Sequence, residues 1–317
     1  MSHELTMRDD GTVEMAYVGE RPWHGLGTKL PEGTPVAEWI GAAGMEWTVE
    51  QSPVEFMVGD EKHSFPDRFV LHRSDNHLPL GVVSSDYCIL NPAECLQFFD
   101  DLVTSVGLSL ETAGTMFGGK RFWALARIGE QAMIDNHDRI KGYLLLSSSA
   151  DGLRATEARH TSIRVVCRNT LRMSDMKDAE GQVKISHRSQ FVAENVKRKL
   201  GIAPKTFETF MENMRRLADV RMSDAKAETM TRKLLGKDEE KTGKRFEKVM
   251  ELFRGAAVGS ELPGVQGTAW GWLNSVTEAV DHHAKSKSDA RKLDSILFGA
   301  GEKLKATALG QALELIA

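Results

Sequence analysis

Apolar and polar side chains alternate along much of the first half of the chain. This is the pattern of β-strands, because successive residues of a strand face opposite sides. Residues 120–128 give one apolar face and one face that carries arginine, formed by Arg121, Trp123, Leu125 and Arg127. Residues 163–168 repeat the pattern, with Ile163 on the apolar face and Arg164 and Arg168 on the cationic one. The alternation predicts a sheet with one basic face.

Turn and cap signals place further elements around these strands. Gly118 and Gly119 tolerate the positive φ of a tight turn, which predicts a hairpin between residues 108–115 and 120–128. Asn91 as cap and Pro92 at the first helical position predict a helix over residues 91–106. Upstream, the pattern predicts a helix over residues 35–43 and strands over residues 47–58, 68–72 and 80–84. The polar turn GDEKHSFPD separates the first two of these strands.

After residue 171 the apolar period changes to that of helices. The clearest helix begins at Pro204, with an apolar stripe formed by Phe207, Phe210, Met211, Met214 and Leu217. The other predicted helices span residues 189–200, 223–235, 238–253, 268–283, 288–298 and 302–315.

Strands followed by helices indicate an α+β fold, since a parallel α/β sheet would alternate the two throughout. We expect a curved antiparallel sheet over residues 47–166, crossed by the helix of residues 91–106, and a helical C-terminal half. The expected regions are 1–188, the α+β part with the basic sheet face, and 189–317, the helical part that packs on it or extends it.

Composition narrows the class of protein. No apolar run approaches the roughly 18 residues of a membrane span, and the first ten residues contain no apolar core of a signal peptide. The three cysteines, Cys88, Cys95 and Cys167, show no C-x-x-C spacing, so neither a disulfide framework nor a thiolate zinc site is indicated. We expect a cytoplasmic protein with no membrane partner.

Charge is unevenly distributed. The chain carries a net charge of −4, yet residues 141–216 contain 15 Lys and Arg against 8 Asp and Glu, which makes this segment +7. Such segregation indicates either a surface for a polyanion or a solvated basic face. For a nucleic-acid interface, the candidates are the basic and aromatic residues of the predicted strands and their connections: Lys120, Arg121, Trp123, Arg127, Arg154, Arg159, His160, Arg164 and Arg168. The alternative is a sheet face covered by the C-terminal helices, with the arginines paired to Asp and Glu.

Motifs of catalysis are not indicated. The segment GTMFGGK has the spacing of a phosphate-binding loop, but Arg121 replaces the hydroxyl residue and a strand follows where a helix is needed. Glu278 and His282 have helical i, i+4 spacing, but no third metal ligand lies nearby in sequence. We therefore expect no catalytic residues, no metal and no cofactor.

Several motifs spread over the chain point to one family. They are PWHGLG at residues 22–27, YCILN at 87–91, ETAGTMFGGKRFWALARI at 111–128, IRVVCRNTL at 163–171, LPGVQGTAWGWLNSVTEAVDH at 262–282 and LFGAG at 297–301. The chain resembles the phage/plasmid-like protein family, an uncharacterised domain carried by phages, plasmids and integrative elements. In architecture and charge it is also similar to the single-strand annealing proteins of mobile elements.

The resemblance implies a non-catalytic protein of a mobile genetic element that binds single-stranded DNA and, in the most specific form of this hypothesis, anneals strands. A homo-oligomer is compatible with this reading. The alternative is a protein-binding module that counters a host defence or restriction factor. A metal-dependent nuclease is a third reading, disfavoured by the lack of a carboxylate cluster. The motifs at residues 22–27 and 262–282 suggest no role.

Overall fold

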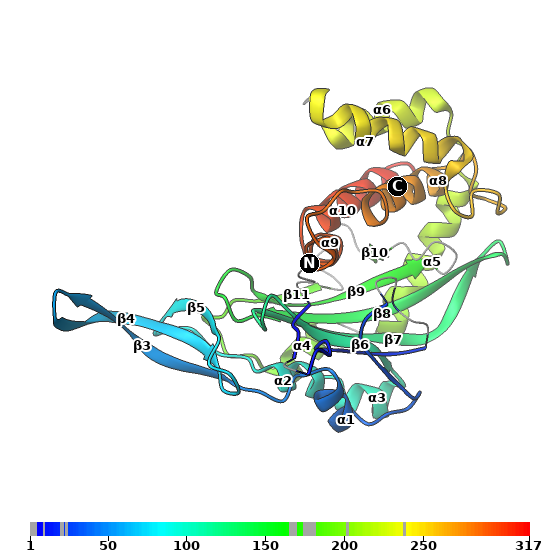
Figure 1. Cartoon of the computed structure of the whole chain (residues 1–317). Coiled ribbons are helices and arrows are strands. Elements are labelled where there is room, and N and C mark those ends of the chain that lie inside the picture. Colours follow the sequence, from blue (N-terminus) through cyan, green and yellow to red (C-terminus); the bar gives the residue numbers. More distant parts are fainter. Residues whose placement is uncertain are drawn as a thin grey trace.

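The computed structural model describes residues 5–8, 10–19, 22, 25–164, 170–173, 182–200, 203–236 and 239–317. Sheets dominate the N-terminal part and helices the C-terminal part, as the α+β prediction expects (Figure 1). Two sequence predictions fall partly outside the described residues: the motif at residues 22–27 and the strand through residues 165–168.

The larger sheet has the strand order β10-β9-β8-β7-β6-β1-β2, and β11 also pairs with β9. All pairs are antiparallel except β1 with β2. The turn between β6 and β7 contains Gly118 and Gly119 at φ 71° and 92°, which confirms the predicted hairpin. The strands are β1 Met15–Val18, β2 Thr28–Leu30, β6 Ser109–Met116, β7 Arg121–Ile134, β8 Asp138–Ser149, β9 Thr156–Arg164, β10 Thr170–Arg172 and β11 Gln182–Ile185.

A second sheet contains β3 Val49–Val58, β4 Glu61–Arg73 and β5 Pro79–Ser84. Its β3–β4 hairpin projects from the body of the molecule (Figure 1). The prediction of one sheet over residues 47–166 is therefore wrong, and so is the nine-residue turn, because β4 begins at Glu61. The turn was predicted because a hairpin exposed on both faces needs no apolar stripe, so its polar residues resembled a loop.

One face of the large sheet is covered by helices from the first half of the chain and by α4 and α5. Cys95 of α2 contacts the carbonyl of Leu146 in β8, and Phe207 of α5 lies against Gly142. The predicted single helix over residues 91–106 is two helices, because the chain turns at Phe98 and Phe99, which are both buried edge to face. These helices are α1 Val36–Ala42, α2 Pro92–Gln97, α3 Asp100–Val106, α4 Ala193–Leu200 and α5 Ala203–Asp219.

Of the remaining helices, α9 and α10 lie over the other face, α8 packs at the β10 edge of the sheet, and α6 and α7 are outermost (Figure 1). Leu293 and Phe298 of α9 pack against the cluster that contains Trp123 of β7. Every residue of α8 is buried, and its indoles donate to Asp138 and Thr231 at 3.0 Å. The elements are α6 Asp224–Leu235, α7 Glu239–Glu251, a π-helical turn η1 Leu252–Ala256, α8 Ala269–Asp281, α9 Asp289–Phe298 and α10 Ala300–Leu313.

One hydrophobic core joins residues on both sides of the predicted division at residue 188, including Phe122 and Met214. The division itself stays a prediction. Within the described residues, none of the helices combines the length and apolar character that crossing a membrane requires.

Replacing glycine by alanine is expected to destabilise the protein at one helical position and to stabilise it at another. A Cβ at Gly271 of α8 would lie 1.9 Å from the carbonyl oxygen of Val265, so Gly271→Ala must displace the main chain. We expect a loss of about 3 kcal/mol in the free energy of unfolding. Gly243 in α7 has open space around it, and Gly243→Ala should gain about 0.5–1 kcal/mol from helix propensity. Denaturant unfolding measures both, and equal effects would contradict the packing of α8.

Candidate functional site

The sheet register decides which of the candidate residues share a face. Arg121 and Trp123 of β7 lie on one face together with Arg159 of β9, connected through their partners in β8. We call this surface the arginine face. His160 pairs with Leu144, so it occupies a position of the opposite face. Placing His160 beside Arg121 was therefore wrong, since the phase between two separate strands cannot be obtained from the alternation within each.

The arginine face is covered by α9. Asp294 of α9 pairs with Arg121 and, at 3.1 Å, with Arg154, whose guanidinium also donates to the carbonyl of Phe298 at 2.5 Å. Arg159 pairs with Glu157 at 2.9 Å and donates to the carbonyl of Leu297. The side chains of Arg121, Arg154 and Arg159 are 16%, 31% and 4% exposed. This is the arrangement of the alternative reading, in which acidic residues pair the arginines beneath C-terminal helices.

The charges of this face compensate one another locally. Burial alone would raise the pKa of Glu157, but Arg159, Lys184 and Arg172 bring it below its ordinary value. Burial lowers the pKa of Arg154, although Asp294 opposes the shift. Arg121, Arg154 and Arg159 thus each have a carboxylate at close range, so these three leave little net charge for an external anion.

The other candidates differ in exposure. Trp123 is 2% exposed and its indole lies 3.4 Å from the hydroxyl of Thr112, so its ring has no free surface for stacking. Lys120 and Arg127 are partly exposed. Arg168 and the side chain of Arg164 lie outside the described part of the chain.

His160 is a buried neutral ring. Burial lowers its pKa to about 4, and neither ring nitrogen has a hydrogen-bond partner among the described residues. At neutral pH it carries no charge, so it adds nothing to the attraction of an anion in this conformation.

The motif at residues 262–282, to which the sequence assigned no role, supplies α8 and a buried ion pair. Lys305 of α10 donates to Asp281 at 2.5 Å, and both side chains are 3% exposed. Asp281 also accepts from the backbone N–H of Thr170 in β10 at 2.6 Å. Burial lowers the pKa of Lys305, and Asp281 opposes the shift. These contacts fasten the edge of the large sheet to α8 and α10.

Glu278, which has i, i+4 spacing to His282, makes its described contacts elsewhere. One of its carboxylate oxygens accepts from the N–H of Val258 at 3.0 Å, and the other lies 3.7 Å from His283. His282 is exposed. The contacts of Glu278 thus secure the loop after η1.

Exposed cations gather instead beside β11. A groove of about 220 Å³ lies between β11 and α4 and is lined by Val183, Lys184, Ile185, Ser186, Ser189, Gln190, Val192, Asn195, Val196 and Lys199. We call it the β11–α4 groove. Lys184 and Lys199 are exposed along it, and Arg188 and Arg198 are exposed in the same segment. Residues 182–200 contain five Lys and Arg but a single acidic residue, Glu194.

Neighbouring contacts hold the groove in place. Lys197 points away from solvent, 3.5 Å from Glu194 and 5.4 Å from the ring centre of Phe98. His187 stacks on Tyr87 at 4.5 Å, and burial lowers the pKa of His187. The Tyr87 hydroxyl donates to the carbonyl of Ser149 at 2.7 Å. The segment that carries the exposed cations is thus fixed to the sheet. The sequence shows the positive charge of this segment, but no motif in it marks these residues as a site.

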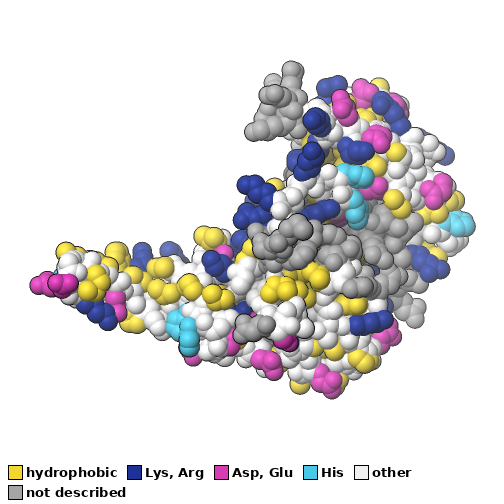
Figure 2. Space-filling model, in the orientation of Figure 1, with side chains coloured by type: hydrophobic (Ala, Val, Ile, Leu, Met, Phe, Trp, Pro, Cys, Tyr) yellow, Lys and Arg dark blue, Asp and Glu magenta, His cyan; other side chains and the backbone are white. Residues whose placement is uncertain are grey.

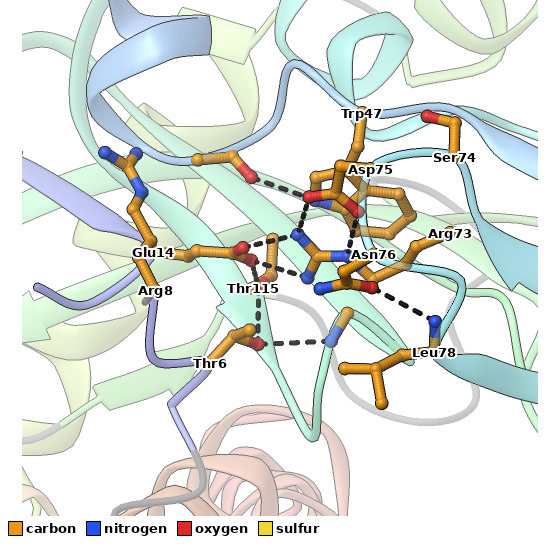
Figure 3. A network of polar contacts seen from close by, with 12 residues as sticks. Thr6, Arg8, Glu14, Trp47, Arg73, Ser74, Asp75, Asn76, Leu78 and Thr115 are labelled. Atoms are coloured by element: carbon orange, nitrogen blue, oxygen red, sulfur yellow. Dashed lines mark hydrogen bonds and ion pairs between the residues drawn. The ribbon is translucent and has the colours of Figure 1, made fainter. Parts of the chain in front are cut away.

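A second prominent feature is the polar network at the root of the projecting hairpin (Figure 3). Arg73 at the end of β4 pairs with Glu14 at 2.6 Å and with Asp75 at 2.7 Å, and its guanidinium lies 4.2 Å from the ring centre of Trp47. The hydrogen bond from Arg73 lowers the pKa of Asp75. Thr115 of β6 donates to Glu14. The network joins the second sheet to the large one.

The hairpin itself exposes apolar side chains (Figure 2). Phe56, Met57, Val58 and Phe65 are 46–60% exposed. Exposed apolar groups that cluster on a projecting element are typical of a surface that meets another macromolecule. The sequence signal was present in FMV at residues 56–58, but the turn prediction for residues 59–67 concealed the hairpin.

Removing the charge of Asp294 tests the pairing on the arginine face. Asp294→Asn leaves Arg121 and Arg154 without their shared partner, so we expect unfolding to become easier by about 2–3 kcal/mol, below the cost of breaking a fully buried pair because Arg154 is partly exposed. Glu314→Gln removes an exposed partner of Lys233 and should change stability by less than about 0.5 kcal/mol. Equal denaturation midpoints for both variants would contradict a stabilising contribution of the Asp294 ion pairs.

Comparison with known proteins adds a family. Residues 79–297, from β5 into α9, match the family described as "Domain of unknown function (DUF932)". No curated protein and no solved structure matches the chain. The matched range covers the large sheet from β6 onward, the β11–α4 groove and α9, and it amounts to more than half of the chain. The chain belongs to the DUF932 family.

Proposed function

We propose that this protein binds single-stranded DNA without catalysis, through the β11–α4 groove. The observation that carries the proposal is the set of exposed cations along this groove, with Lys184 on one wall and Lys199 on the other. Lysine and arginine that neutralise phosphates release counterions, which supplies most of the affinity of sequence-independent binding. Arg121 and Arg159 of the arginine face, in contrast, are enclosed and each pairs directly with a carboxylate. Lys184 lies opposite Glu157 in the β9–β11 pair but stays exposed to solvent.

The lining of the groove favours contacts to a nucleic-acid backbone. Ser186, Ser189, Gln190 and Asn195 offer hydroxyl and amide donors of the kind that bind phosphate oxygens. The groove is lined by no aromatic residue among those that the structure describes, so stacking on bases contributes little there. A strand held by its backbone keeps its base edges free to pair. This property suits strand annealing, the finer form of the proposal, and agrees with the resemblance to mobile-element proteins.

A structural explanation for the same charges has to be weighed. Lys197, Arg198 and Lys199 lie in the last turn of α4, where cations favour the negative end of the helix dipole. The helix dipole therefore explains only the three cations of α4. Lys184 lies on β11 and Arg188 in the loop between them, so the dipole gives no reason for cations at either position.

A double variant tests the groove directly. Lys184→Ala/Lys199→Ala should weaken binding to a fluorescent oligothymidine and reduce the slope of log K against log salt by on the order of 1–2 units, because each lost phosphate contact contributes about 0.7 on a single strand. The control is Lys244→Ala/Arg245→Ala, which removes two exposed cations of α7. Anisotropy titrations at several salt concentrations measure the slope.

The controls separate the outcomes. If the groove variant still binds and its slope of log K against log salt is unchanged, the interface lies elsewhere, and Lys120 and Arg127 become the next candidates to test. No binding by the parent protein to single strands would end the proposal. Cleavage of the oligonucleotide in the presence of magnesium would support the nuclease reading instead.

The exposed hairpin favours a second candidate, a protein-binding role. A second copy of the chain is the first partner to test, because an exposed apolar strand pair can pack against its own equivalent. Met57→Ser/Val58→Ser should convert an oligomer to monomers of 35.1 kDa by light scattering, whereas Lys62→Ser on the same hairpin should not. A parent protein that is monomeric at every concentration would exclude self-association, and the hairpin would then need a different protein partner.

A further inference from the structure

Three potential metal ligands meet at the root of the projecting hairpin. Glu50, His72 and His77 each offer a ligand atom, and these atoms all lie within 4.8 Å of one another. Within the described residues this is the one group of at least three such side chains. We infer that these residues bind a divalent transition-metal ion of the zinc type.

The strand register brings two of the ligands together. Glu50 of β3 pairs directly with His72 of β4, and directly paired residues place their side chains on the same face of a hairpin. A carboxylate oxygen of Glu50 lies 3.7 Å from Nδ1 of His72. Two ligand atoms about 2.1 Å from a tetrahedral ion are about 3.4 Å apart, so this spacing is close to that of a bound pair.

The third ligand comes from the turn between β4 and β5. The N–H of His77 donates to the carbonyl of Arg73 at 3.1 Å, and the N–H of Leu78 donates to the side chain of Asn76 at 3.1 Å. These bonds hold His77 at φ 60°, a conformation uncommon for residues other than glycine. The rings of His72 and His77 consequently lie 6.1 Å apart, edge to face.

The surroundings fit a bound cation. Nε2 of His72 lies 3.0 Å from the hydroxyl of Ser52, which can accept the proton of that nitrogen and leave Nδ1 free for a metal. Nδ1 also lies 3.3 Å from the carbonyl of Arg73, which can only accept, so this contact belongs to the tautomer with the proton on Nδ1. A metal at Nδ1 replaces that hydrogen bond and leaves the ring proton on Nε2, facing Ser52. The guanidinium of Arg73 is turned to the other side of the hairpin, where Glu14 and Asp75 neutralise it.

Two imidazoles and one carboxylate are the donor set of zinc sites that keep a position open for water. Glu50 is about half exposed, so the ion would be reachable and exchangeable. Because its ligands come from β3, β4 and the following turn, a bound ion would cross-link the root of the hairpin. The three residues precede the range that matches the family, so the inference concerns this chain and is independent of DNA binding.

The test is a titration of the full chain, without a histidine tag, with Zn²⁺ in competition with a chromophoric chelator. We expect one site per chain. His77→Ala and His72→Ala should each weaken Zn²⁺ binding at least about 10-fold, since even residues that only support a ligand change affinity 10–100-fold. The matched control is His63→Ala, an exposed histidine farther out on the same hairpin that stacks on Phe56.

Two further measurements make the outcome decisive. Co²⁺ should give the visible absorption of a low-coordinate site in the parent and the control, and not in His77→Ala. Zn²⁺ should raise the melting temperature of the parent and the control but leave His77→Ala unchanged, and Mg²⁺ should have no effect. Zn²⁺ binding that is equal in His77→Ala and the parent, or equally weakened by His63→Ala, would overturn the inference.

Discussion

The buried ion pair between Arg73 and Glu14 is the contact on which the relative placement of the two sheets depends. Both side chains are almost fully enclosed, at 2% and 4% exposure. Removing one partner of such a pair typically costs about 3–5 kcal/mol, because the remaining charge is left without solvent or a counter-ion. Burial alone would lower the pKa of Arg73, but its hydrogen bonds to Asp75 and Glu14 raise it. The guanidinium of Arg73 therefore stays charged across the physiological pH range.

Segments far apart in sequence converge on this pair. The Thr6 hydroxyl accepts from the N–H of Gly119, and the hydroxyls of Thr6 and Thr115 lie 2.6 Å apart. Gly119 cannot carry a side chain, since a Cβ there would lie 2.6 Å from the ring of Trp47. The glycine pair that looked like a hairpin signal in the sequence thus has a second reason to be glycine. The same contacts let the β3–β4 hairpin project without packing of its own, since its root is fixed by charge, hydrogen bonds and one indole.

Local sequence patterns predicted the helices and strands of the fold, but not which strands pair or in which register. The hairpin at Gly118 and Gly119, the helix that starts at Pro92 and the helical second half all follow from turn chemistry and periodicity. The split into two sheets does not, because nothing in the period of residues 47–84 states which strand lies beside which. The faces within β7 were predicted well, since Phe122 and Trp123 do lie in separate clusters. The phase of β9 relative to β7 depends on inter-strand register, and there the prediction for His160 was wrong.

The candidate site could be predicted only in part for a similar reason, because the pairing of charges also depends on residues far apart in the sequence. A count of +7 over residues 141–216 identifies a cationic segment, but a count cannot separate charges that are neutralised by distant residues from charges left in solvent. Asp294 and Glu302 come from the last helices of the chain, and they pair with Arg121 and Arg172 far upstream. Among the described residues of that segment, Arg159 and Arg172 are buried, whereas Lys184, Arg188, Arg198 and Lys199 around β11 and α4 are exposed, as are Arg215 and Arg216 of α5. For the proposed binding of a polyanion, what counts is therefore which cations the C-terminal helices leave exposed, more than how many the sequence contains.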